Sequence, residues 1–126
     1  MDYYIVIPIH NEEAYLESTL NSILGQTLPP KKVLLVNDNS TDSTETIIKS
    51  FSLKHTVFQK LNIISSTQHM PGSKVINAFN EGFKVLDESF DFIVKLDADI
   101  ILPNNYFEVI STHFRNEPKL GICGGF

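Results

Sequence analysis

Apolar runs alternate along the chain with segments whose apolar residues recur at helical spacing. Short runs rich in β-branched residues predict strands at residues 3–9, 33–36, 61–64, 90–96 and 120–123. Between them, apolar side chains three and four positions apart predict amphipathic helices, each with one buried face. The residues expected on these faces are Leu16, Leu20, Ile23 and Leu24, then Ile47, Ile48 and Phe51, then Ile76, Phe79, Phe83 and Leu86, and finally Phe107, Val109, Ile110 and Phe114.

Polar residues mark the expected starts of the helices. Asn11 is a suitable N-cap for the first helix, with Glu12 and Glu13 favourably placed in its first turn. Ser40 or Asp42 would cap the second helix in the same way. The chain contains no repeat, low-complexity tract or linker, which predicts a single domain over residues 1–126.

Strands that alternate with helices are typical of an α/β fold. We expect a Rossmann-like, mostly parallel sheet with helices on both faces. Right-handed crossovers bring the carboxyl end of every strand to one edge, and ligands bind at that edge in such sheets. Polar clusters at residues 11–13, 37–42 and 97–99 follow predicted strands. The sequence therefore predicts a binding site where these three clusters meet.

Asp97 and Asp99 follow the apolar run at residues 92–96 and are separated by one residue. Because side chains alternate along a strand, their carboxylates would point to the same side and repel each other. A divalent metal ion with oxygen ligands would relieve this repulsion. A solvated turn after the strand explains the same two residues without any ligand. The convergence of the three polar clusters favours the metal ion.

A metal ion at Asp97 and Asp99 could also bind the oxygens of a nucleoside diphosphate. Asp38, at the end of a neighbouring strand, could accept a hydrogen bond from the ring N–H of a pyrimidine base. An Asx turn or a helix cap is an equally good local explanation for Asp38. Gly72, Ser73 and Lys74 precede a helix, so backbone N–H groups and the Lys74 ammonium could meet phosphate oxygens, although a lone lysine there is usually just solvated.

Four motifs occur in an order and spacing that resemble a known family. They are Ile-Pro-Ile-His-Asn-Glu-Glu at 7–13, Leu-Val-Asn-Asp-Asn-Ser-Thr-Asp at 35–42, Asn-Glu-Gly at 80–82 and Lys-Leu-Asp-Ala-Asp at 95–99. With them, essentially the whole chain resembles the family 2 glycosyltransferases of the GT-A fold. These are inverting transferases that use nucleotide-sugars.

The resemblance implies a role for each matching position. The segment from Pro8 to Glu12 would line the nucleotide pocket, and Asp38 would hydrogen-bond the base, commonly uracil. The D-x-D motif would touch the sugar-diphosphate and hold Mg²⁺ or Mn²⁺, with Asp99 as the direct ligand. The residues expected to bind the donor are Pro8, His10, Asn11, Glu12, Asn37, Asp38, Lys74, Asp97 and Ala98, and those expected to bind the metal ion are Asp99 and Asp97.

Three positions depart from the family pattern. Asn37 stands where the family often has an aspartate, so it can hydrogen-bond but brings no charge. Asn39 stands where the family often has glycine, and asparagine tolerates the left-handed backbone that such a turn needs. Phe79 replaces an arginine found in many relatives, so a phosphate contact there would fall to Lys74 instead.

The catalytic domain of the family continues well beyond a position like Phe126. The resemblance therefore implies that the acceptor-side half, with the Asp or Glu that acts as general base, lies outside this chain. We expect the chain to be part of a longer transferase and to hold no catalytic residue itself. The implied reaction is a single displacement with inversion onto a glycan or a lipid-linked acceptor.

Composition narrows the partners and the compartment. The formal net charge is −5 and lysine and arginine do not cluster, which argues against a nucleic-acid-binding surface. No apolar run is long enough to span a bilayer, and the start of the chain predicts no signal peptide. Cys123 is the single cysteine, which suits a reducing compartment. We expect a cytoplasmic protein, either free or peripherally associated with the inner face of the membrane.

Two other functions fit parts of the pattern. A D-x-D motif also begins the site of haloacid-dehalogenase-type phosphatases, but there it lies on the first strand and a small or hydroxyl residue follows. Here it lies on the fourth predicted strand and Ile100 follows. A calcium-binding loop is disfavoured because the positions after Asp99 are apolar. A nucleotide-sugar-binding module without catalysis remains compatible with the sequence.

Overall fold

Parallel strands form one sheet in the part of the chain that the computed structural model describes, residues 1–65 and 73–116. The strand order is β3-β2-β1-β4, so the chain fills the sheet outward from β1 on one side and then returns to pair β4 with its other side. The strands are β1 (Tyr3–Ile9), β2 (Lys32–Asp38), β3 (Phe58–Ile63) and β4 (Phe92–Lys95). The predicted α/β class and parallel sheet are confirmed.

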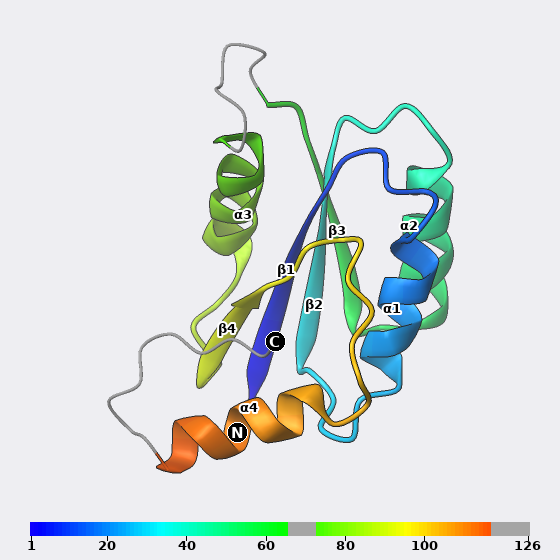
Figure 1. Ribbon diagram of the computed structural model, residues 1–126. Coiled ribbons are helices and arrows are strands. Elements are labelled where there is room, and N and C mark those ends of the chain that lie inside the picture. The colour runs from blue at the N-terminus through cyan, green and yellow to red at the C-terminus, as the bar shows by residue number, and fades with distance from the viewer. Residues whose placement is uncertain (66–72, 117–126) are drawn as a thin grey trace.

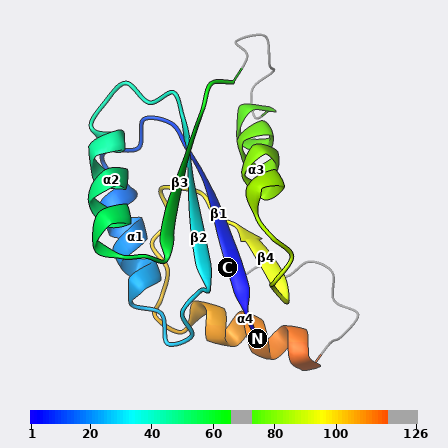
Figure 2. The same ribbon diagram turned by 180° about the vertical axis from the view of Figure 1, so that it is seen from behind.

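Helices cover both faces of this sheet. They are α1 (Leu16–Leu24), α2 (Thr44–Lys54), α3 (Ser73–Val85) and α4 (Tyr106–Asn116). Figures 1 and 2 show α1 and α2 on one face and α3 on the other, with α4 lying across the end at which the strands begin. Within the described ranges, no helix is long and apolar enough to cross a membrane.

The core follows from the alternation of side chains along the central strands. Ile5, Ile7 and Ile9 of β1 join the larger cluster, which also takes in buried residues of α1, α2 and α4. Val6 points the other way, into a smaller cluster beneath α3. Both sides of β1 are therefore apolar, and burying each such aliphatic side chain contributes about 1.5–3 kcal/mol.

Helix α3 approaches the sheet closely because Gly82 has no side chain. A Cβ at this position would lie 2.8 Å from Val36 Cγ2 and 2.9 Å from Val6 Cγ1. Ala78, one turn earlier, is also buried against the sheet. Phe79 and Leu86 pack against the same cluster, as predicted. The prediction that Ile76 and Phe83 also face the sheet is wrong, since they are 61% and 46% exposed.

The first helix begins later than the sequence predicts. Asn11 has φ = +50°, whereas an N-cap residue takes an extended backbone, so Asn11 does not cap the helix. The chain first makes a turn in which the N–H of Leu16 donates to the carbonyl of Glu12 over 2.9 Å. Glu12 and Glu13 therefore lie before α1, in the loop at the end of β1, where Glu13 Oε2 accepts the N–H of Ser43 over 3.0 Å.

Other boundaries also shift. The cap position of α2 is Ser43, without a side-chain capping bond, but Asp42 Oδ1 accepts the N–H of Thr44 over 2.9 Å. Strand β3 begins earlier than expected and β4 is shorter than the predicted 90–96. Leu24 and Val109 are 37% and 45% exposed, and so are not buried as predicted. The strand predicted at 120–123 lies outside the described residues.

Candidate functional site

The ends of β1, β2 and β4 meet at one edge of the sheet. Ile9 pairs with Asn37, so β1 and β2 finish side by side. Strand β4 ends lower, with Lys95 opposite Val6, and the chain beyond it continues along β1, where Leu96 N–H donates to the Val6 carbonyl over 3.1 Å. In Figure 1 the connections after β1 and β2 lie at the same end of the sheet. The predicted convergence of the three polar clusters is confirmed.

The loops after β1 and β2 are joined by hydrogen bonds in both directions. The N–H of Asn11 donates to Ser40 Oγ over 3.0 Å, and the N–H of Thr41 donates to Asn11 Oδ1 over 2.7 Å. The N–H of Glu12 donates to the buried Thr44 Oγ1 over 2.9 Å. Backbone groups that would otherwise be left unpaired are thereby satisfied, and the two loops form a single preformed edge.

Each of these loops contains an asparagine with a left-handed backbone. The φ angles are +50° at Asn11 and +52° at Asn39. Asparagine enters this region more readily than most residues because its short amide can bond locally. The prediction that Asn39 preserves a turn usually made by glycine is confirmed.

Asp38 lies at the end of β2 and is only 7% exposed. Its Oδ1 accepts the N–H of Ser65 over 2.9 Å, while its carbonyl oxygen accepts a hydrogen bond from His10 Nδ1 over 2.7 Å. The structure records no hydrogen bond from the described part of the chain to the second carboxylate oxygen. Among the described residues, this oxygen is left as an acceptor for a further donor, such as a ring N–H.

Asn37 points to the opposite face of the sheet from Asp38, because neighbouring residues alternate along β2. Its Oδ1 accepts the N–H of Ser40 over 3.3 Å, so its amide shapes the turn. Asn37 also lines a hollow of about 230 Å³ together with Glu45 of α2 and Asn62 of β3. The structure thus separates two neighbours that the sequence assigned to one pocket.

The Asp97-Ala98-Asp99 segment is a turn and not a continuation of β4. The strand ends at Lys95, and the N–H of Ile100 donates to the Asp97 carbonyl over 3.3 Å. The argument from strand alternation therefore does not apply to the two carboxylates, which are both exposed. Lys95 Nζ lies 3.2 Å from Asp97 Oδ1 and supplies a neighbouring positive charge.

Helix α1 holds this turn in place through a buried side chain. Thr19 Oγ1 donates a hydrogen bond of 2.9 Å to the carbonyl of Ala98, and Thr19 is 0% exposed. Ala98 itself is 4% exposed and packs in the larger core cluster. The turn that carries the two aspartates is thus fixed from beneath by the core.

The carboxylates of the edge influence one another. The pKa of Glu12 is raised, first because its partial burial disfavours the charged form and then because Asp99, Asp42 and Asp97 add negative charge nearby. His10 opposes this effect. Both aspartates of the D-x-D motif thus contribute to the raised pKa of Glu12, and the combined negative charge favours a cation at this edge.

Asp97 and Asp99 offer the hard oxygen donors that Mg²⁺ and Mn²⁺ prefer. Among residues 1–65 and 73–116, no three His, Cys, Asp or Glu side chains are arranged to hold a metal ion by themselves. The residues therefore fit a cation that takes its remaining ligands from water or from a bound anion.

For Pro8 and Lys74, two of the residues predicted to bind the donor, only the position in the fold is described. Pro8 is half-buried near the end of β1, opposite Val36. Lys74 lies in the first turn of α3, but its side chain is outside the described part of the structure, as is Gly72. Their predicted contacts with the donor stay predictions.

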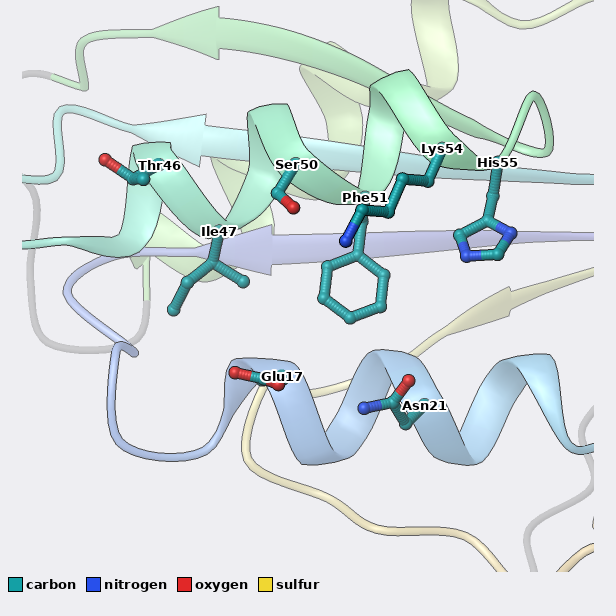
Figure 3. A pocket seen from close by; sticks show the side chains of 8 residues that line it. All are labelled: Glu17, Asn21, Thr46, Ile47, Ser50, Phe51, Lys54 and His55. Atoms are coloured by element: carbon teal, nitrogen blue, oxygen red, sulfur yellow. The ribbon is translucent and has the colours of Figure 1, made fainter.

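A larger hollow, of about 370 Å³, lies between α1 and α2 (Figure 3). Figure 3 shows Glu17 and Asn21 of α1 facing residues of α2 such as Phe51 across it. None of the predicted site residues lines this hollow. It is therefore separate from the edge formed by the three loops.

The sequence analysis missed several polar residues that build the site. Thr19 and Thr44 are buried and hold the loops. Ser65 donates its N–H to Asp38, and Asn77 in turn donates to the Ser65 hydroxyl. A threonine among the apolar positions of α1 was the available signal, since a buried hydroxyl needs a hydrogen-bond partner.

Comparison with known proteins identifies the family. The model for "Glycosyl transferase family 2" matches residues 4–126. Over 121 residues the chain is 30% identical to the poly-β-1,6-N-acetyl-D-glucosamine synthase of Staphylococcus epidermidis, an alignment that covers 95% of this chain and 27% of the synthase. The chain thus spans about a quarter of the length of the curated relatives it matches.

Solved structures share the fold. S. aureus TarS 1-349 in complex with UDP-GlcNAc superposes with a TM-score of 0.72 at 20% identity, covering 94% of this chain and 32% of TarS. The mannosyltransferase PcManGT from Pyrobaculum calidifontis, in complex with GDP-Man and Mn²⁺, gives a TM-score of 0.74 at 19% identity, covering 94% and 33%. The likeness confirms the GT-A fold, and the family match removes the phosphatase alternative. The chain belongs to glycosyl transferase family 2.

Proposed function

We propose that this chain binds the donor of a glycosyltransferase that moves a sugar from a UDP-sugar to an acceptor hydroxyl with inversion. The observation that carries the proposal is the meeting of Asp38, Glu12 and the D-x-D turn at one edge of the sheet. An acceptor for a base N–H and a pair of metal-binding carboxylates are the groups that a nucleoside diphosphate with a divalent cation requires.

Different residues would bind different parts of the donor. Asp38 would accept the ring N–H of the base through its second carboxylate oxygen, and the loop from Pro8 to Glu12 would form a wall of the nucleotide pocket. Asp97 and Asp99 would hold Mg²⁺ or Mn²⁺, which when bound supplies positive charge that stabilises the departing diphosphate. The pKa of Glu12 is raised first by burial and then by Asp99, Asp42 and Asp97, and a cation would relieve the second, repulsive part of this effect.

The reaction itself needs a group beyond these residues. A general base would take the proton from the acceptor hydroxyl, and the oxygen would attack the anomeric carbon as its bond to the diphosphate breaks. Attack from the side opposite the leaving group inverts the configuration at that carbon. We propose that residues 1–126 are the donor-binding part of a longer domain, because the relatives that match them are several times longer.

The first sugar to test is N-acetylglucosamine. The matched synthase is named for a polymer of N-acetyl-D-glucosamine, and the TarS complex contains UDP-GlcNAc. A polysaccharide or lipid-linked acceptor at the cytoplasmic face of the membrane would suit a synthase of this kind. Both the sugar and the location belong to the proposal.

A transfer assay on the full-length protein tests the proposal. UDP-GlcNAc, UDP-glucose and GDP-mannose are each incubated with Mn²⁺ and an N-acetylglucosamine oligosaccharide, and the product's anomeric configuration is read by NMR. We expect a β-linked product from the α-linked UDP-sugar, lost with EDTA and with Asp99→Asn. A product of retained configuration contradicts inversion, and binding without turnover supports a nucleotide-sugar-binding module.

A further inference from the structure

A chain of two hydrogen bonds joins Asp38 to helix α3. The N–H of Ser65 donates to Asp38 Oδ1 over 2.9 Å, and Asn77 Nδ2 donates to Ser65 Oγ over 3.0 Å. The two bonds connect the end of β2, the segment after β3 and the second turn of α3. We propose that Asn77 is a positioning residue which, through Ser65, fixes the carboxylate of Asp38 and thereby sets the choice of nucleobase.

Burial protects the bond between Ser65 and Asp38 from water, so that this bond can orient the Asp38 carboxylate. Asp38 and Ser65 are 7% and 9% exposed, so water competes little for the bond between them. The Ser65 amide engages one carboxylate oxygen and so determines where the other oxygen points. Ser65 lies two residues after Ile63, the last residue of β3, and its hydroxyl accepts the bond from Asn77 of the neighbouring helix α3.

Helix α3 is a rigid support for Asn77. Ala78 is buried against the sheet, and Gly82 lies so close to β1 and β2 that a Cβ would meet Val6 and Val36. A helix seated in this way cannot slide without losing those contacts. The amide of Asn77 is therefore held at a fixed distance from the end of β2.

The chemistry of a carboxylate then decides which bases fit. An ionised carboxylate only accepts hydrogen bonds. The ring N3–H of uracil donates to it, whereas the ring N3 of cytosine is itself an acceptor and would repel it. Discrimination between uracil and cytosine depends on holding the carboxylate oxygen in line with that ring position. This inference rests on the proposed function, since it requires the base to lie at Asp38.

Loss of the Asn77 side chain should therefore reduce the discrimination between UDP and CDP while the protein still folds. Contacts to the diphosphate through Asp97 and Asp99 are common to UDP and CDP and should be retained. A misdirected carboxylate loses its bond to uracil and repels cytosine less. The ratio of the Kd for CDP to the Kd for UDP should fall by about three- to tenfold, as for loss of one well-placed hydrogen bond.

Calorimetric titration of the full-length protein with UDP and with CDP, both with Mn²⁺, tests the inference. We expect Asn77→Ala and Ser65→Ala to reduce the CDP/UDP ratio of Kd values, and Ser65→Thr, which keeps the hydroxyl, to preserve it. Lys84→Ala, exposed on the same helix, is the matched control and should leave the ratio unchanged.

The possible outcomes are distinct. An unchanged ratio in both alanine variants, with UDP still bound, overturns the inference and leaves the proposed function intact. A ratio that Ser65→Thr lowers as much as Ser65→Ala also overturns it, because the hydroxyl would then be irrelevant. If Asn77→Ala does not fold, the two Ser65 variants decide alone. Absence of UDP binding by the wild-type protein overturns both the inference and the proposed function.

Discussion

The hydroxyl of Thr19 on α1 donates a hydrogen bond of 2.9 Å to the carbonyl of Ala98, the residue between Asp97 and Asp99. Replacing Thr19 by valine keeps the shape but leaves a buried carbonyl unpaired, which costs about 1–3 kcal/mol. We expect Thr19→Val to weaken Mn²⁺-dependent UDP binding as well as stability, and Thr19→Ser to retain both. Titration and urea unfolding measure the two effects, and equal UDP affinity in all three proteins would contradict the role of this bond.

Gly82 is the position at which the packing of α3 is most easily tested. A methyl group there would press on Val6 and Val36, and overpacking of this kind costs about 1–3 kcal/mol. Gly82→Ala should therefore lower the free energy of unfolding, although alanine favours helix formation more than glycine does. Lys84→Ala, on the exposed side of the helix, should change it by less than about 0.5 kcal/mol. A Gly82→Ala protein more stable than wild type in urea unfolding would refute the close approach.

The left-handed backbone at Asn39 makes a second prediction about stability. Asn39→Ala should destabilise the protein by about 1 kcal/mol, because a Cβ without a local hydrogen bond is disfavoured at φ = +52°. Asn39→Gly should be close to neutral, since glycine enters this region without strain. Thermal denaturation of the two variants checks this order, and an alanine variant as stable as the glycine variant would exclude the strain.

Glu12 should make stability depend on pH. The pKa of Glu12 is raised on folding from its usual value of 4.5. A carboxyl of this kind leaves the free energy of unfolding undiminished below its usual pKa, and lowers it as the pH rises from that value through the higher pKa of the folded state. Glu12→Gln removes the charge, so the variant should gain stability relative to wild type on going from pH 4 to pH 7. Mn²⁺ should reduce that gain by screening the carboxylates.

Urea unfolding at both pH values measures this gain. Glu88→Gln, in the segment before β4, is the control for removing one negative charge. A stability difference between Glu12→Gln and wild type that stays the same, or shrinks, between pH 4 and pH 7 would show that the edge does not crowd Glu12 with negative charge.

The sequence predicted the fold class and the converging loops because these depend on patterns that are local. Alternating apolar runs and turn residues place β1 at Tyr3–Ile9, as expected. The contact face of α3 could be predicted only in part in this way, through Phe79 and Leu86. Hydrophobicity favoured Ile76 and Phe83, but close approach to the sheet is possible only over Ala78 and Gly82, and that requirement arises from the tertiary fold.

In the candidate site, too, some residues could be predicted from local sequence patterns and others could not. The acidic motif and Asp38 stand out in the sequence, whereas the residues that hold them do not. Asn11 was expected to cap a helix, but its carbonyl oxygen Oδ1 instead accepts the N–H of Thr41, thirty positions away. Ser65 reaches Asp38, and Asn77 reaches Ser65, only because β2, β3 and α3 come together. Supporting contacts of this kind depend on long-range geometry that no local pattern encodes.

The central claim is that this edge of the sheet binds a nucleoside diphosphate together with a divalent cation. Isothermal titration of UDP into the full-length protein, with and without Mn²⁺, tests it most directly. We predict saturable binding that Mn²⁺ strengthens in the wild type, with the Mn²⁺ effect lost in Asp99→Asn and the affinity for UDP reduced in Asp38→Ala. No heat with UDP, GDP or dTDP in the presence of Mn²⁺ would contradict the claim.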